Sequence, residues 1–410
     1  MPANSRGAVR VFAPGKLYLA GEYAVTEPGG GAIIVAVNRG ITVTVAPLPA
    51  AAGSSTVTDP VYGAQPCPWQ LCGDRVVIAD HEYDYVAAAL TVMHEARAAA
   101  PGSHAAQDPA RELAAAELPQ DPQHCAIAIS SNLQAANGEK YGLGSSGAVV
   151  AAVVRALTDF YQLGYSQEQQ YRLALLASCT ISTAGSGGDI AASIFGGWIR
   201  YHAPDRAALA AIHRKQGLQA ALTSELWEFG GVTPLRPVPG VELVVGWTGA
   251  PVLTDEMLEK AARVRQTPLW PEFVERSNAC VARFAAALET AAGVAAAGAS
   301  AASATDVVAG EAGAADVAVV AELAAAVECA GGALRQLSAA GGFTIETVRL
   351  RALRETAAAA GAASKSSGAG GGDCGFALVT NAAQRERILA GWERAQIKHL
   401  DLEVYNHEQQ

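Results

Sequence analysis

A glycine- and serine-rich stretch, residues 137–149 (NGEKYGLGSSGAV), runs directly into a long apolar segment. Apolar residues at 149, 150, 153, 154 and 157 fall on one face of an α-helix. A glycine-rich turn that leads into a helix exposes unpaired backbone N–H groups beside the positive end of the helix dipole, which suits a phosphate. Glycine lets the anion approach the backbone because it carries no side chain. The stretch therefore predicts a phosphate-binding loop.

The pattern leaves the kind of loop open. Residues 142–147 match the dinucleotide pattern GxGxxG, but residues 370–375 match it equally well. A dinucleotide site needs a strand directly before the glycines, whereas residues 137–141 are polar. The Walker sequence and the protein-kinase HRD and DFG sequences are absent. A plain structural interpretation also stays open, in which the serines cap the first amides of the helix.

Composition limits the class of protein. A chain of 410 residues is long enough for about two domains. Its 29 basic and 39 acidic residues give a net charge of −10, which argues against nucleic acid or an anionic membrane as the main partner. Seven scattered cysteines without metal-site spacing predict reduced thiols. We find no signal segment or membrane span in the sequence and expect a soluble, cytoplasmic protein.

Residue patterns predict strands alternating with helices, and a domain boundary at the glycines and prolines near 230–240. The expected domains are residues 1–235 and 236–410. Residues 32–37 and 41–46 predict the two strands of a hairpin, residues 50–72 a loop, and residues 101–123 an exposed insertion. The other expected strands are 8–13, 76–79, 125–130, 197–202, 241–247, 376–380 and 399–404. The expected helices are 84–99, 148–161, 166–178, 254–265, 271–291, 317–340, 343–360 and 382–396.

Two further loops and one lysine accompany the glycine loop. Lys16 follows Pro14–Gly15, Asp189 ends a flexible loop at 182–188, and residues 364–375 form a third glycine-rich loop. Each has a plain alternative: a solvated lysine, a helix cap, and a flexible connector. Together they offer backbone amides for phosphates, a cation for developing charge and a carboxylate near an attacking oxygen, which phosphoryl transfer requires.

On these residues the chain resembles the GHMP kinases, the superfamily of galactokinase, homoserine kinase, mevalonate kinase and phosphomevalonate kinase. Three motifs occur in the expected order: PGKLYLAGEYAV from Pro14, GLGSSG at 142–147, and SSGAGGGD at 366–373. Within the superfamily the likeness is greatest to the bacterial phosphomevalonate kinases. The strings that carry it are GKLYLAGEYAVTEPG, KYGLGSSGAVV, VGWTG and KSSGAGGGDCGFAL.

The resemblance implies a fold and a reaction. The expected fold is α+β, with an N-terminal domain like domain 2 of ribosomal protein S5, a ferredoxin-like C-terminal domain, and the site between them. ATP would phosphorylate (R)-5-phosphomevalonate, giving (R)-5-diphosphomevalonate and ADP in the mevalonate route to isoprenoids. The alternatives are mevalonate kinase or another GHMP kinase, the related diphosphomevalonate decarboxylase, and a non-catalytic nucleotide-binding protein. The sequence does not predict the oligomeric state.

The resemblance also implies residue roles. Lys16 would bridge the transferred phosphoryl group and the acceptor, and Asp189 matches a proposed general base of mevalonate kinases. Because the acceptor is a phosphate with a second pKa of about 6, we expect Asp189 to orient Lys16 and the acceptor more than to remove a proton. The expected ATP-binding residues are Lys140, Gly142, Leu143, Gly144, Ser145, Ser146 and Gly147. The expected substrate-binding residues are Glu22, Tyr23, Lys365, Ser366, Ser367, Gly370, Gly371 and Asp373.

Ser146 matches the family serine whose hydroxyl meets Mg²⁺. An acidic magnesium ligand is not evident, because residues 171–186 contain no Asp or Glu, and Glu22 and Asp189 are both candidates. Lys140 and Lys365 are expected to contact acceptor or donor phosphates, and an exposed lysine beside a loop is the alternative for each.

Overall fold

The computed structural model describes residues 7–79, 83–99, 124–135, 137–252, 254–301 and 317–407. The predicted insertion at 101–123 and residues 302–316 of an alanine-rich stretch lie outside the described residues.

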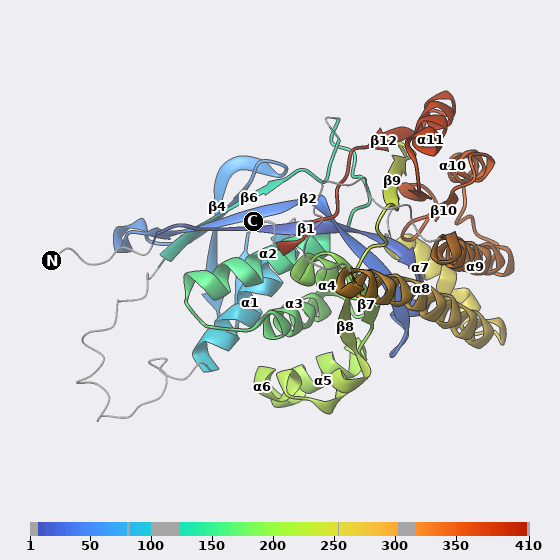
Figure 1. Cartoon of the computed structure of the whole chain (residues 1–410). Helices are drawn as coiled ribbons and strands as arrows, with labels where there is room; N and C mark the ends of the chain where they lie inside the picture. The colour runs from blue at the N-terminus through green and yellow to red at the C-terminus, as the bar shows by residue number, and fades with distance from the viewer. Residues whose placement is uncertain are drawn as a thin grey trace.

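The first sheet is mixed and contains eight strands within the described part of the chain. The order is β5-β4-β3-β6-β2-β7-β8, and β1 pairs with β2 as well (Figure 1). Neighbouring strands are antiparallel except β3 and β6, which are parallel. The strands are β1 (Val9–Ala20), β2 (Gly31–Leu48), β3 (Ser55–Asp59), β4 (Gly63–Cys72), β5 (Arg75–Ile78), β6 (His124–Ser131), β7 (Trp198–His202) and β8 (Gly231–Leu235).

Strand β2 runs without a break through residues 38–40, so the predicted hairpin at that point is wrong. The glycine there has a different reason. Gly40 pairs with Pro14 of β1, and a Cβ at Gly40 would lie 2.0 Å from the carbonyl oxygen of Ala13. Strand β1 also continues past Pro14, where the register shifts between Pro14 and Gly15. Proline is tolerated at such a bulge because the ladder does not need its missing N–H.

The predicted loop at 50–72 is also wrong, because it contains β3 and β4. In β3 the side chains of Ser55, Val57 and Asp59 are buried and alternate with half-buried ones. This alternation is too short to predict a strand from the sequence. Strand β4 contains two prolines, which are uncommon inside sheets and argue against a strand.

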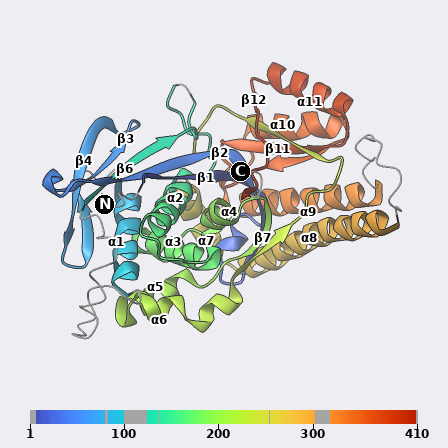
Figure 2. The same ribbon diagram turned by 60° about the vertical axis from the view of Figure 1, so that its left-hand side comes forward.

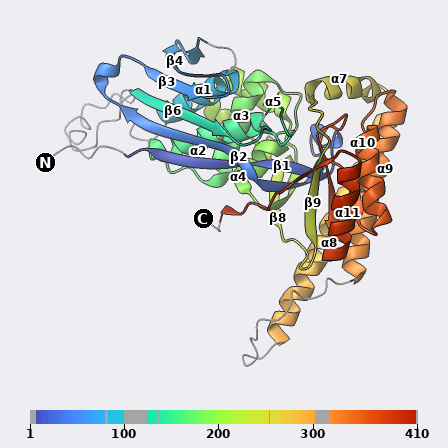
Figure 3. The same cartoon turned by 90° about the horizontal axis from the view of Figure 1, so that it is seen from above.

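Helices cover one face of the first sheet (Figures 1 and 3). Helix α3 begins with the predicted capping box, in which Ser166 and Gln169 bond each other's backbone N–H groups. Helices α2 and α4 contact β1 and β2 directly, and α3 packs behind them. The helices of this layer are α1 (Asp84–Ala99), α2 (Ser145–Phe160), α3 (Gln167–Ile181) and α4 (Gly188–Phe195), with α5 (Arg206–Gln216) and α6 (Leu218–Leu222) outside them.

The second sheet has four antiparallel strands in the order β10-β11-β9-β12. Its strands are β9 (Glu242–Trp247), β10 (Ala363–Ser366), β11 (Cys374–Val379) and β12 (Lys398–Leu400). Its helices are α7 (Thr254–Arg265), α8 (Leu269–Ala301), α9 (Val317–Gly341), α10 (Val348–Ala359) and α11 (Ala382–Arg394). Figure 2 shows α8 and α9 side by side below this sheet. The predicted α+β class is confirmed, with two sheets and helices packed on them.

The two long helices are joined covalently. Cys280 of α8 and Cys329 of α9 form a disulfide, with Cα atoms 5.7 Å apart. The prediction of reduced thiols is therefore wrong for this pair, because antiparallel packing brings together residues 49 positions apart. Cysteines 67, 72, 125, 179 and 374 are free.

Within the described residues, one helix, α9, is long and apolar enough to cross a membrane by length and composition alone. In its most apolar window 44% is buried inside the protein, and it packs against α8 and β10. We therefore interpret α9 as a core helix, and cytoplasmic location stays a prediction.

The end of the chain returns to the first sheet. Asn38 N–H donates to Glu403 O at 2.9 Å, and Tyr405 N–H donates to Ala36 O at 3.0 Å. The other connection between the sheets lies between β8 of the first sheet and β9 of the second. The predicted boundary at 235/236 lies in that connection and stays a prediction.

Removing the disulfide is expected to lower stability without abolishing the fold. A 49-residue separation predicts a contribution of about 2–4 kcal/mol. The double variant Cys280→Ser/Cys329→Ser should therefore unfold at a lower denaturant concentration, measured by circular dichroism. A reducing agent should shift the wild-type curve toward that of the variant. Identical curves for oxidised protein and variant would contradict this expectation.

Candidate active site

The predicted phosphate-binding loop, residues 142–147, leads into α2 and is called the phosphate loop below. Its glycines set the conformation of its backbone. Gly142 and Gly144 have positive φ angles of 77° and 83°, a region that side chains disfavour. Gly144 is the N-cap of α2, and no side chain caps the helix. The structural alternative, in which Ser145 or Ser146 caps α2, is therefore wrong. The first amides of α2 are left for an anion.

Strand β1 places Lys16 against this loop. Its backbone N–H donates to Leu143 O at 2.9 Å, and its Nζ donates to Gly142 O at 3.1 Å. A Cβ at Gly144 would lie 3.1 Å from two carbons of the Lys16 side chain and 3.3 Å from Cβ of Asp189. The missing side chain thus lets the lysine and the aspartate both approach the start of α2.

Asp189 lies in the first turn of α4, whose N-cap is Gly187. Its Oδ1 accepts the N–H of Ile190 at 3.0 Å, while its Oδ2 would be 2.4 Å from a Cβ at Gly147. Helix α4 is tied to the first motif, because Ser193 Oγ donates to Pro14 O at 2.6 Å. The carboxylate therefore faces the first turn of α2.

The third loop connects β10 to β11 and closes over the same place. The backbone N–H of Tyr18, two residues after Lys16, donates to Ser367 Oγ at 2.9 Å. The Tyr23 hydroxyl donates to Ala369 O. A Cβ at Gly368 would lie 3.8 Å from Lys16 Nζ. The structure thus brings together the three motifs that the sequence singled out.

Asp373 joins the third loop to the phosphate loop. Its φ of 52° is unusual for a residue with a side chain, and its carboxyl carbon would be 2.4 Å from a Cβ at Gly142. Its Oδ1 accepts the N–H of Val252 at 3.2 Å. Burial raises the pKa of Asp373 to about 6, although the positive charge of Lys16 lowers it. This carboxyl therefore titrates near pH 6, well above an ordinary aspartate, and lies beside the phosphate loop.

Comparisons with known proteins agree with this geometry. Residues 105–197 match the GHMP kinases N terminal domain, and residues 321–399 match the GHMP kinases C terminal domain. The chain is 36% identical over 407 residues to the phosphomevalonate kinase of Streptomyces sp. (strain CL190), covering 98% of each. The chain belongs to the GHMP kinase superfamily. The predicted resemblance, including that to the bacterial phosphomevalonate kinases, is confirmed.

Two solved structures share the fold of this chain. A Lin0012 protein from Listeria innocua superposes with a TM-score of 0.79 at 28% identity, covering 98% of each chain. The Streptococcus pneumoniae phosphomevalonate kinase in complex with phosphomevalonate and AMPPNP superposes with a TM-score of 0.73 at 24% identity. That match covers 97% of this chain and 100% of the other.

The remaining predicted ligands have different surroundings. Lys140 is exposed, in an isolated bridge with Gln134. Lys365 and Glu22 are buried against each other, with side-chain exposures of 1% and 3%. Gly371 N–H donates to Ile345 O at 2.7 Å, which attaches the third loop to the segment before α10. Contact of either lysine with a phosphate stays a prediction.

Sequence reasoning missed the residues that hold the Asp189 loop. Tyr18 shares the face of β1 with Lys16 because strand side chains alternate, and its hydroxyl lies 2.7 Å from Ser186 Oγ. Arg206 is buried and donates to Ser178 Oγ at 2.9 Å and to Ser182 O at 2.7 Å. The two-residue spacing from Lys16 is a signal for Tyr18, whereas Arg206 has none.

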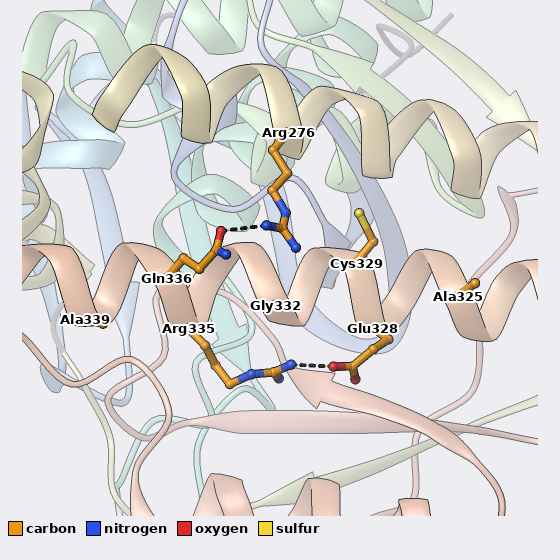
Figure 4. A pocket seen from close by; sticks show the side chains of 8 residues that line it. All are labelled: Arg276, Ala325, Glu328, Cys329, Gly332, Arg335, Gln336 and Ala339. Carbon is orange, nitrogen blue, oxygen red and sulfur yellow. Dashed lines mark hydrogen bonds and ion pairs between the residues drawn. The ribbon is translucent and has the colours of Figure 1, made fainter. Parts of the chain in front are cut away.

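A cavity of about 520 Å³ lies elsewhere, between α8 and α9 (Figure 4). It is lined by Arg276, Ala325, Glu328, Cys329, Gly332, Arg335, Gln336 and Ala339. None of these residues belongs to the phosphate loop or to the surroundings of Lys16 and Asp189. We therefore treat it as separate from the candidate active site.

Gly147→Ala should reduce turnover while leaving the fold intact. The backbone of α2 suits alanine, which favours helices by up to about 1 kcal/mol over glycine, but the new Cβ displaces the Asp189 carboxylate. We expect kcat to fall by at least about tenfold, because small displacements of reacting groups are costly. The matched control is Gly332→Ala in α9, where the nearest atom is 3.4 Å away. Full activity in Gly147→Ala would contradict the placement of Asp189.

Asp373→Asn should change the pH dependence of ATP binding. Below a pKa of about 6 the carboxyl is neutral, and above it the charge repels phosphates beside Gly142. The ratio of wild-type to variant KM for ATP should therefore rise between pH 5 and pH 7.5, and the titration of the substrates cancels in this ratio.

The free energy of unfolding gives a second test of Asp373, because ionisation of this carboxyl should be unfavourable for folding as well as for ATP binding. The native carboxyl binds its proton more tightly than the carboxyl of the unfolded chain, which has the ordinary aspartate pKa of 3.8. Wild-type stability relative to Asp373→Asn should therefore fall as pH rises from about 4 through about 6. A pH-independent KM ratio together with a pH-independent stability difference would contradict the assignment.

Proposed function

We propose that the protein transfers the terminal phosphoryl group of ATP to (R)-5-phosphomevalonate, forming (R)-5-diphosphomevalonate and ADP in the mevalonate pathway. The observation that carries the proposal is the convergence of Lys16 and Asp189 on the uncapped N-terminus of α2. A relative 36% identical over 98% of the chain is a phosphomevalonate kinase, and a protein of the same fold binds phosphomevalonate and AMPPNP.

The ATP phosphates bind to the loop at 142–147. Its uncapped amides and the positive end of α2 stabilise negative charge without any basic side chain in the first turn. The glycines admit the phosphate oxygens to the backbone, and Ser145 and Ser146 add hydroxyl groups at the start of the helix. Lys140 is exposed at the entrance to this loop, where it contacts the donor phosphates.

Lys16 lies between donor and acceptor. Its ammonium group already touches Gly142 O and approaches the third loop at Gly368. In this position it offsets the charge that spreads over the phosphoryl oxygens during transfer. Asp189 orients Lys16 and the acceptor, because a phosphate acceptor with a second pKa of about 6 needs little deprotonation at neutral pH.

The donor set fits Mg²⁺. The Ser146 hydroxyl lies in the first turn of α2, and the Asp189 carboxylate faces Gly147, the next residue. Of the two acidic candidates, Glu22 is buried against Lys365, so Asp189 is the acid positioned to contribute. Few protein oxygens suffice, because Mg²⁺ takes most of its ligands from phosphates and water. When bound, Mg²⁺ neutralises charge on the ATP phosphates.

The substrate is tested by a coupled assay of ADP release with ATP and Mg²⁺. Mevalonate, 5-phosphomevalonate and 5-diphosphomevalonate are supplied separately, and turnover is expected with 5-phosphomevalonate. Lys16→Met serves as the control and should reduce kcat by at least about a hundredfold, because it removes a charge that stabilises the transition state. Turnover of mevalonate alone would assign a mevalonate kinase. No turnover with any of the three would favour a non-catalytic nucleotide-binding protein.

A further inference from the structure

We infer that Glu22 and Lys365 form a positioning pair that fixes the third loop over Lys16, and that neither side chain binds the acceptor phosphate. This inference rests on the proposed function and deepens it.

The ammonium group of Lys365 is surrounded by protein groups. Its Nζ donates to Glu22 Oε1 and, at 2.6 Å, to Ser366 O. The same atom lies 5.5 Å from the centre of the Phe376 ring, within range of a cation–π contact. Its side chain is 1% exposed, so a phosphate reaches it only if the loop opens.

The pair connects the first motif to the third. Glu22 lies two residues after the end of β1, and Lys365 lies in β10 of the second sheet, 343 residues later. Two other bonds join the same segments, from Tyr18 N–H to Ser367 Oγ and from the Tyr23 hydroxyl to Ala369 O. Gly368 lies between these attachment points and beside Lys16 Nζ. The ion pair is thus one of three ties that hold this backbone above the catalytic lysine.

Charge gives the reason for a paired lysine at this place. A free cation inside the loop would compete with Lys16 for the acceptor phosphate, whereas the Glu22–Lys365 pair has no net charge. Burial lowers the pKa of Lys365 below its ordinary value, although the Glu22 carboxylate partly opposes this shift. Both groups are removed from water, and removing either partner therefore leaves the other desolvated and unpaired. Glu22 Oε2 has no hydrogen-bond partner within the described residues, which makes the bare carboxylate still less stable.

A double-mutant comparison separates positioning from direct binding. The variants are Glu22→Gln, Lys365→Met and the double variant, in which the glutamine amide can donate to the Ser366 carbonyl that Lys365 leaves. For each single variant we expect a lower melting temperature and a fall of at least about tenfold in kcat/KM for 5-phosphomevalonate. The double variant should regain most of both. KM for ATP should change by less than about twofold, because the ATP phosphates bind at α2.

The matched control is the exposed pair Arg385–Glu242, which links α11 to β9 within the second sheet layer. Neutralising either of its residues should alter neither stability nor kinetics appreciably.

Two results would overturn the inference. If the double variant regains its melting temperature but not its kcat/KM, Lys365 binds the acceptor directly. If the single variants lose stability with unchanged kinetics, the pair is structural only. Failure of the proposed function gives a different result, because the wild type then does not turn over 5-phosphomevalonate. The same comparison is in that case made with whichever GHMP substrate it does turn over.

Discussion

The uncapped N-terminus of α2 is the constraint on which the site depends. A helix end without a side-chain cap leaves backbone amides unpaired, and this is tolerable where an anion binds. The arrangement also requires space, which Gly144 and Gly147 provide by lacking side chains. Lys16 and Asp189 occupy that space from two different elements, β1 and α4. The proposed phosphate site and the approach of Lys16 and Asp189 to it thus both depend on the missing side chains of these two glycines.

The elements that carry these groups are fixed by buried polar contacts rather than by apolar packing alone. Ser193 ties α4 to the carbonyl of Pro14, and Arg206 holds the loop before Asp189 through Ser178 and Ser182. The pKa of Tyr18 is raised, mainly by burial and then by the charge of Asp189, so its hydroxyl stays neutral. It therefore acts as a hydrogen-bonding group beside Ser186 and not as a base.

The sequence predicted the motifs well and their detailed surroundings less well. Glycine spacing before an apolar helix is a local signal, and so are the capping box at Ser166 and the helix at α1, all of which the structure confirms. The turn-like residues at 38–40 misled because Gly40 is required by close contact with β1, which is a tertiary cause. The Cys280–Cys329 bond and the pairing of Glu22 with Lys365 are also tertiary. No spacing in the sequence reveals a partner 343 residues away.

The burial of Lys365 bears on how such a site handles two anions. Donor and acceptor are both phosphates in the proposed reaction, and more cations would stabilise the ground state and the transition state alike. Uniform binding of this kind lowers KM without raising kcat. In the proposed arrangement, a lysine neutralised by Glu22 avoids that outcome, since it orders the third loop and leaves Lys16 to respond to charge that develops during transfer. In the same proposal the amides of α2 act from fixed positions, so that the transferring group is stabilised mainly by preorganisation.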